Sequence, residues 1–408
     1  MVSDDSLLAL ANHALTYLGQ PNRLHEIQHC CEVIGATLPL SDGSYVSSRV
    51  RYLRSSQTLA VVEKAITKFK AKTTIDSIPS LVKEIESELA LLESVLMKEL
   101  VVISPTPLPT GFVKEFGSSC IIEGQKLDFA TDPALSSAAE KLVKEYFELA
   151  GQNAPSLSNL IWVSCSIHAR DAGFVFQEFL GLVSTFFAFV NFECVGQSIQ
   201  PLSNTPLTNF RASRTVFAFE KGNMTEWIIV DFPDPYLLGA KLLDSARFKK
   251  ILDEMYYPLK DGNIKNLLLE SLDLYSSAVT EADVGFAFLK YWIVVETTAA
   301  LRELIPEKAL KERVRNYFIN KSPAFESEID MTLRKRNSMV HDAEWESIGH
   351  HDLVFSKLLA DLMLGVLWKF ALEKRSISIV KAIFENAGLP ERELDAIREA
   401  IEYLKASK

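Results

Sequence analysis

This sequence has few cysteines, and their arrangement does not suggest a disulfide framework. The 408 residues include five of them, at positions 30, 31, 120, 165 and 194. Their number is odd, their spacing is irregular, and no pair has the CxxC spacing of redox and zinc motifs. We therefore expect reduced thiols and a cytoplasmic protein.

The sequence also lacks a targeting segment and a long apolar run. The N-terminal stretch MVSDDSLLALANHALTYL begins acidic and turns amphipathic, without the basic start and cleavage site of a signal peptide. The most apolar run, FLGLVSTFFAFV at 179–190, is too short to span a bilayer. We expect a buried helix there and no membrane association. Internal repeats and low-complexity tracts are absent.

The composition is that of a globular protein with several cores. Apolar residues make up 48% of the chain, and its length favours two or three domains. The formal net charge of −10 repels nucleic acid. Binding of RNA would therefore need a local basic patch or a groove shared between subunits.

Hydrophobic periodicity predicts an α+β fold that is mostly α, with a break after the first hundred residues. Residues 1–102 have helical spacing and form an N-terminal helical region. The stretch VISPTPLPTG at 102–111 has three prolines in alternate positions, which favours an extended linker and a domain boundary.

Residues 111–255 predict a small mixed α/β module. A strand is expected at 160–167, and an apolar helix begins near residue 171 and ends near 192. A hairpin is expected from 215–220 and 227–230, with its turn at Lys221, Gly222 and Asn223.

Residues 262–408 predict helices alone: a bundle with a C-terminal helical extension. Helices are expected at 263–278, 284–304, 308–319, 326–340 and 353–372, followed by a final pair at 376–387 and 391–405.

Arg336, Asn337 and His341 form the most suggestive motif in the chain. A permanent cation, an amide and a titratable imidazole lie within one short stretch, a set that can hold a phosphate and move a proton beside it. The spacing alone is weak evidence, since Arg23 and His29 are spaced almost the same way. An i, i+5 pair shares a helix face only where the helix ends or loosens, and a polar loop follows His341.

With this motif, residues 262–375 resemble a HEPN domain, the helical bundle of many metal-independent ribonucleases. The family motif is an arginine, a polar residue and, a few positions later, a histidine, and Arg336, Asn337 and His341 match it. Glu296, in YWIVVETTAAL, lies where such domains often have an acidic residue. The chain is most similar to the Apea-like HEPN group, in which a mixed region with an apolar helix precedes the bundle, as SIHARDAGFVFQEFLGLVSTFFAFVNF does here.

The resemblance implies an endoribonuclease that uses no metal or cofactor and acts as a homodimer on RNA. His341 would move a proton, Arg336 would neutralise the phosphate, Asn337 would orient the phosphate or the imidazole, and Glu296 would position Arg336 or His341. Proteins of this kind are often toxins or antiviral defence effectors, and the preceding regions would then sense a trigger or restrain the nuclease. Basic residues expected to line the RNA groove are Lys311, Arg313, Arg315, Lys321, Arg334 and Lys335.

Two other interpretations remain open. Arg336 would pair with a carboxylate and His341 would cap the helix C-terminus if the bundle were a non-catalytic module for dimerisation or nucleotide binding. Separately, His25, Glu26 and His29 form a literal HExxH. On a helix both histidines would lie on one face and could hold zinc, with Glu26 as base. The sequence offers no clear third ligand, and a plain amphipathic helix explains this stretch as well.

Overall fold

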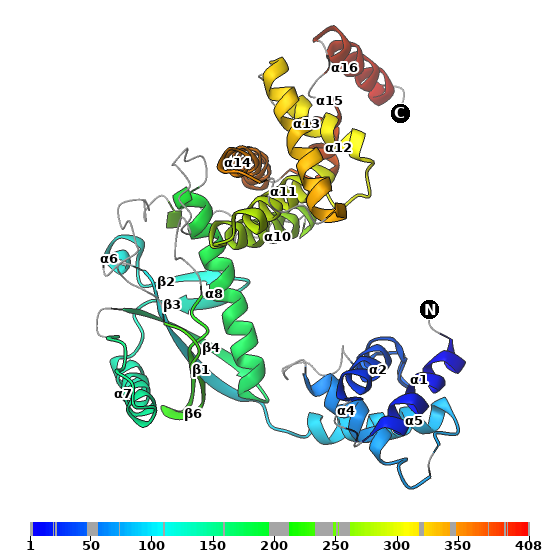
Figure 1. Cartoon of the computed structure of the whole chain (residues 1–408), viewed down its shortest axis with the longest axis vertical. Helices are drawn as coiled ribbons and strands as arrows, with labels where there is room; N and C mark the ends of the chain where they lie inside the picture. Colours follow the sequence, from blue (N-terminus) through cyan, green and yellow to red (C-terminus); the bar gives the residue numbers. More distant parts are fainter. Residues whose placement is uncertain are drawn as a thin grey trace.

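The protein is described by a computed structural model in which three groups of elements follow one another along the chain (Figure 1). The mostly helical α+β fold is confirmed. The structure describes residues 3–18, 20, 23–46, 56–72, 74–108, 111–157, 160–195, 212–232, 248–249, 252, 262–317, 322–342, 348–373, 375–386, 389 and 391–406.

The N-terminal region is a helical unit with its own apolar core. Its helices are α1 (Asp4–Tyr17), α2 (Leu24–Thr37), α4 (Ser56–Thr67) and α5 (Ile78–Glu93). Leu7, Ile34, Ile66 and Leu81 are among the buried residues of this core, which is separate from the rest. Asn12 also fixes the segment before α5, because its amide exchanges hydrogen bonds with both backbone groups of Ile75, at 3.2 and 2.8 Å.

The middle of the chain is a six-stranded antiparallel sheet in the order β2-β3-β4-β1-β5-β6. Helix α7 packs on one face and α8 on the other (Figure 1). The elements are β1 (Lys98–Thr106), α6 (Phe112–Phe116), β2 (Ser119–Ile122), β3 (Gln125–Asp128), α7 (Pro133–Leu149), β4 (Ile161–Ala169), α8 (Ala172–Val195), β5 (Val216–Glu220) and β6 (Asn223–Ile228).

The expected linker at 102–111 is wrong, because its first half, residues 102–106, lies in strand β1 near the centre of the sheet. β1 pairs with β4 along its whole length, including Pro105 opposite Trp162. On its other side β5 pairs only with Val101 to Ile103. At Pro105 the strand is therefore an edge on that side, where a residue without an amide N–H is tolerated. The boundary of the N-terminal unit thus lies before Lys98 rather than after residue 102.

The predicted hairpin is confirmed. β5 and β6 pair from Val216 opposite Ile228 to Glu220 opposite Asn223. Lys221 and Gly222 both have positive φ, 52° and 82°, as the two-residue I′ turn requires.

The predicted buried apolar helix is also confirmed, although α8 is longer than the apolar run. Among the described residues it is the one helix long and apolar enough to cross a membrane, yet more than half of that stretch is buried. It lies between the sheet and α10 (Gly262–Val279). Phe192 contacts the rings of Tyr275 and Trp368, and Asn191 donates to Ser276 at 2.7 Å. The sheet and the bundle therefore share one core, and the predicted division between 111–255 and 262–408 is not a boundary between cores.

The C-terminal bundle is built around two apolar helices. Helices α11 (Val284–Ala300) and α14 (His350–Leu372) pack against each other and against α10. The remaining elements are α12 (Glu307–Tyr317), α13 (Pro323–Asn337), the π-helical turn η3 (Ser338–Asp342), α15 (Ile377–Asn386) and α16 (Glu391–Ala406).

Candidate active site

Helix α13 brings the predicted motif to the edge of the bundle. The side chain of Ser322 caps its first turn by accepting from the N–H of Phe325, and Pro323 fits the first helical position. Ile329 and Leu333 face the core. Three cations, Arg334 to Arg336, occupy the last turn, where the helix dipole favours positive charge.

The helix then widens into the π-helical turn η3, which includes His341. In an ideal α-helix, residues five apart point about 140° away from each other. A π-turn has more residues per turn, so this angle becomes smaller between Arg336 and His341. Single π-turns occur frequently at functional sites. The expected loosening of the helix before His341 is therefore present.

Arg336 is held by an acidic partner from α11. Its Nη2 lies 3.0 and 3.2 Å from the two carboxylate oxygens of Glu296. Glu296 in turn accepts from the indole Nε1 of Trp292 at 2.8 Å. Trp292 is 1% exposed, so the buried core fixes the carboxylate and the carboxylate orients the guanidinium. The expected contact between Glu296 and Arg336 is present.

Asn337 continues this network on the exposed side. Its Oδ1 accepts from Nη1 of Arg336 at 3.1 Å, and its Nδ2 donates to Glu307 at 3.3 Å. In the described structure Asn337 thus orients the arginine rather than the imidazole. We call Trp292, Glu296, Arg336, Asn337 and Glu307 the Arg336 network.

His341 is exposed, while the guanidinium beside it is partly covered. The Arg336 side chain is 27% exposed, and its Nε atom is buried with no hydrogen-bond partner among the described residues. Unsatisfied buried donors are rare in folded proteins and ask for an explanation, which a functional role or a bound species can provide. The described hydrogen bonds of Arg336 and Asn337 do not include His341.

A buried carboxylate ties the start of α14 to α13. Asp352 accepts from Lys335 at 2.6 and 2.7 Å and from the N–H of Gly349 at 2.8 Å. Its side chain is 7% exposed. One carboxylate therefore connects the end of α13 with the beginning of α14, and η3 lies in the segment between these two points.

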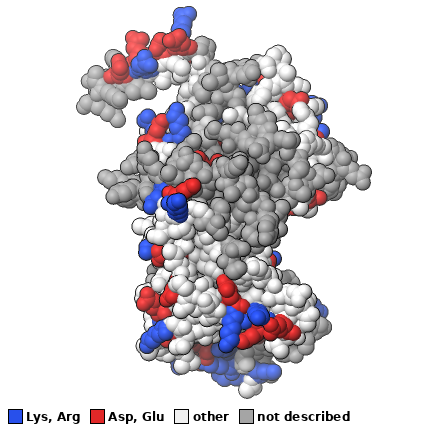
Figure 2. Space-filling model, turned by 90° about the vertical axis from the view of Figure 1, so that its left-hand side faces the viewer, with Lys and Arg blue, Asp and Glu red and all other residues white. Residues whose placement is uncertain are grey.

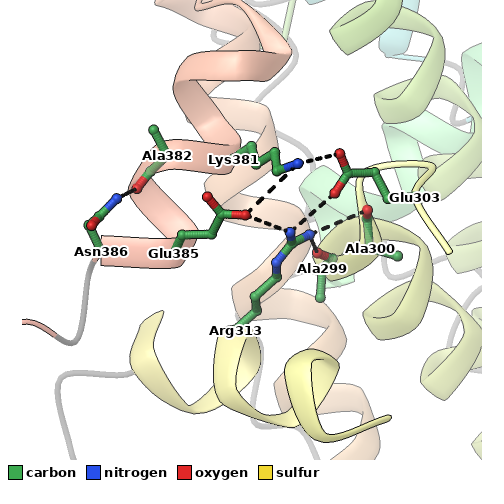
Figure 3. Close-up of polar contacts among 8 residues, drawn as sticks. All are labelled: Ala299, Ala300, Glu303, Arg313, Lys381, Ala382, Glu385 and Asn386. Carbon is green, nitrogen blue, oxygen red and sulfur yellow. Dashed lines mark hydrogen bonds and ion pairs between the residues drawn. The ribbon is translucent and has the colours of Figure 1, made fainter. Parts of the chain in front are cut away.

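Of the six basic residues expected to line an RNA groove, the structure describes five, and these differ in exposure and in their partners. Arg313 contradicts the prediction most clearly, because its side chain is only 8% exposed (Figure 3). It donates to the carbonyl of Ala299 at 3.0 Å and to Glu303 and Glu385 at 3.2 and 3.1 Å. Arg313 therefore caps the C-terminus of α11 and joins it to α15, and it is unavailable to RNA.

The other cations are mostly paired. Lys311 forms an ion pair with Asp330, Arg315 with Glu326, and Lys335 with Asp352. Arg334 is exposed, and Lys321 lies outside the described residues. Figure 2 shows Lys and Arg interspersed with Asp and Glu over the visible face.

The HExxH stretch lies at the start of α2, with His25 and His29 exposed. Glu26 pairs with Arg23 and lies 3.6 Å from Nε2 of His13. The described part of the chain contains no group of three or more His, Cys, Asp or Glu side chains arranged to hold a metal ion.

Sequence reasoning missed Trp292 and Asp352 as supporting residues. Trp292 precedes Glu296 by one helical turn, and this i, i+4 spacing was the available signal. Asp352 could not be connected with Lys335 from the sequence, because a loop of unknown geometry separates them.

No protein-family model, curated protein or solved structure matches this chain. The functional argument therefore rests on the residues themselves, and the resemblance to HEPN domains stays a prediction.

Proposed function

We propose that this protein is a cytoplasmic, metal-independent endoribonuclease of HEPN type that acts through Arg336 and His341. The observation that supports it most is the combination of a partly exposed arginine, oriented by Glu296 and Asn337, with an exposed histidine on a π-turn directly after it. The two side chains belong to consecutive turns of one segment, and Lys335 next to Arg336 is bound to Asp352 of α14.

In the proposed reaction, the 2′-hydroxyl of the RNA attacks the adjacent phosphorus. The O2′–P bond forms while the P–O5′ bond breaks, the 2′-hydroxyl loses a proton, and the departing 5′-oxygen gains one. His341 accepts the first proton or donates the second. The products are a 2′,3′-cyclic phosphate and a 5′-hydroxyl end.

Arg336 would neutralise the charge that develops on the phosphoryl oxygens. A guanidinium has five N–H donors, and the described hydrogen bonds to Glu296 and Asn337 occupy two of them. The remaining donors can meet phosphate oxygens once the side chain shifts toward solvent. A homodimer would bring a second copy of the motif to the same substrate, and a toxin or antiviral defence role would suit such an activity.

The alternative is a non-catalytic module for dimerisation or nucleotide binding, and one observation favours its dimerisation form. Glu296 already neutralises Arg336 in the free chain, which lowers its attraction for a phosphate. In that case the Arg336 network would be structural, and His341 would act as a cation at a helix C-terminus.

Replacement of His341 separates these two functions. We expect His341→Ala to abolish cleavage of single-stranded RNA, with the thermal unfolding midpoint unchanged because the side chain is exposed. General acid–base catalysis contributes about 10² to 10⁴ in rate. His351→Ala is the matched control, since this exposed histidine pairs with Glu328 at 3.1 Å and has no proposed role.

Cleavage by the wild type should be unchanged in EDTA. Activity that disappears with EDTA and returns with zinc would instead support the HExxH stretch. Equal cleavage by the wild type and His341→Ala would contradict the proposed role of the histidine.

A further inference from the structure

Helix α16 has apolar residues that are exposed in the part of the helix whose side chains the structure describes. All of its described side chains from Glu391 to Glu399 are exposed, including Leu394 at 40% and Ile397 at 39%. Figure 1 shows α16 beyond the bundle, at the end of the chain. The neighbouring α15 differs, because its Val380 and Phe384 are fully buried. Exposed apolar residues that recur on one face of a helix can mark a contact with a partner.

The spacing of the apolar residues of α16 is that of a coiled coil. Leu394, Ile397, Ile401 and Leu404 follow one another at intervals of three, four and three residues, which places them at successive a and d positions of a heptad repeat. We propose that α16 pairs with α16 of a second copy of this chain, as a parallel two-stranded coiled coil.

Charge complementarity identifies both the occupant and its direction. In this heptad Glu393 occupies a g position and Arg398 the following e position. Two parallel copies place each Glu393 beside Arg398 of the other, so that two attractive pairs flank the seam. An antiparallel pair would instead place the two Arg398 side chains together. The present partner of Arg398 is Asp395 at 3.3 Å, and both side chains are largely exposed, 74% and 60%. Such an exposed ion pair contributes little to stability, so Arg398 can leave Asp395 for Glu393 of the second copy at little cost in free energy.

The charge of α16 disfavours an acidic lipid surface or a nucleic acid as the occupant. Its acidic residues are Glu391, Glu393, Asp395, Glu399 and Glu402, and its basic residues are Arg392, Arg398 and Lys405. Five acidic against three basic side chains give a net charge of −2 over this helix. Helices that bind anionic membranes have the opposite balance.

Helix α15, which precedes α16, is held to the bundle by the ion pairs around Arg313. Lys381 of α15 lies 2.6 Å from Glu303, and Glu385 accepts from Arg313 (Figure 3). Helix α15 is therefore attached to α11 and α12, and pairing through α16 would hold two bundles near each other. The proposal does not depend on RNA cleavage.

Sedimentation velocity of the full chain over a range of concentrations tests the pairing. We expect the wild type to dimerise and Leu394→Asp or Ile397→Asp to raise the dissociation constant at least about tenfold, because a carboxylate would be buried in the seam. Ala396→Asp is the matched control, since it adds the same charge at the exposed c position and should leave the dimer unchanged. Thermal unfolding of the core should be the same in all variants.

A charge exchange tests the direction. Glu393→Arg and Arg398→Glu should each weaken the homodimer through like charges, and an equimolar mixture of the two variants should recover a heterodimer. A monomeric wild type, a dimer that survives both seam variants, or equal weakening by Ala396→Asp would overturn the pairing. A homodimer that neither charge variant weakens would overturn the parallel direction, because an antiparallel pair places like charges together both before and after each replacement. Binding of a monomeric chain to phosphatidylserine vesicles through Leu394 would assign the face to a membrane instead.

Discussion

Two arginines of the C-terminal bundle, Arg313 and Arg336, have similar partners but different surroundings. Each binds a carboxylate from α11 or the turn after it and a second polar side chain. Arg313 is 8% exposed, whereas Arg336 is 27% exposed. Arg313 also donates to a main-chain carbonyl at the end of α11. Arg336 instead leads directly into the π-turn with His341.

The difference shows how burial separates a structural cation from a candidate functional one. A buried guanidinium with several acceptors stabilises the fold, and its removal leaves those acceptors unpaired. A partly exposed guanidinium contributes less to stability and can still reach a ligand. The charge of the residue is the same in both cases, so the surroundings decide its role.

The largest expected effect is on activity. Arg336→Ala should lower RNA cleavage about 10² to 10³-fold, the loss typical of one donor that stabilises transition-state charge. Its free energy of unfolding should fall by about 1 kcal/mol or less, because the ion pair is partly exposed. Arg336→Lys should keep the charge and lose the planar fork, and so retain an intermediate rate. Single-turnover cleavage measures the rate, and urea unfolding measures the free energy of unfolding. A large loss of stability in Arg336→Ala without a loss of activity would make Arg336 a structural residue.

Arg313→Ala should have the opposite profile. We expect the free energy of unfolding to fall by about 2 kcal/mol, because the buried carbonyl of Ala299 loses a charged donor. Glu303 and Glu385 are 38% and 46% exposed, so water solvates these carboxylates in the variant. Under conditions where the variant is folded, cleavage should stay close to that of the wild type. Urea unfolding beside an RNA cleavage assay tests this. A stable Arg313→Ala variant with weakened RNA binding would restore the discarded groove prediction.

These two arginines also show what local sequence patterns could and could not predict. The contact between Glu296 and Arg336 is one of two that the resemblance to HEPN domains implies, the other being a contact with His341. The two residues of the observed pair lie 40 positions apart in the chain, so local spacing alone does not connect them. The burial of Arg313 was not predicted, because α15 covers it from more than seventy residues further along the chain, and local periodicity contains no information about that packing.

The fold itself was predictable where a local signal decided the structure. The Lys221–Gly222 turn determined the hairpin, and the run at 179–190 gave the core helix. Pro105 misled, because a strand tolerates proline where its neighbour ends, and the end of β5 is a property of the whole sheet. Pro107 follows the strand, and Pro109 lies outside the described residues. The shared core of sheet and bundle was also not predicted, because it depends on packing between elements far apart in the sequence.

The smallest expected effect is a pH dependence of the stability that the ion pairs of Glu303 with Lys381 and Arg313 contribute. Hydrogen bonds and charge from Lys381, and then from Arg313, lower the pKa of Glu303 below its ordinary value of 4.5. The unfolded carboxyl therefore takes up a proton first as the pH falls. The stabilisation is complete above about pH 4.5 and is lost as the pH falls through the native pKa of Glu303.

Lys381→Ala should reduce this acid-dependent loss of stability, because Glu303 loses the partner that lowers its pKa most. Urea unfolding of the wild type and the variant at about pH 7 and about pH 3.5 provides the comparison. An identical pH dependence in both proteins would remove Lys381 as the cause.

The most direct test of the central claim is cleavage of two matched RNA substrates in EDTA, one unmodified and one with 2′-O-methyl groups. If the 2′-hydroxyl is the nucleophile and His341 moves a proton, the unmodified RNA is cut to fragments with 2′,3′-cyclic phosphate ends and the methylated RNA stays intact. Cleavage of the methylated RNA, or no cleavage of either substrate at any protein concentration, would contradict the account.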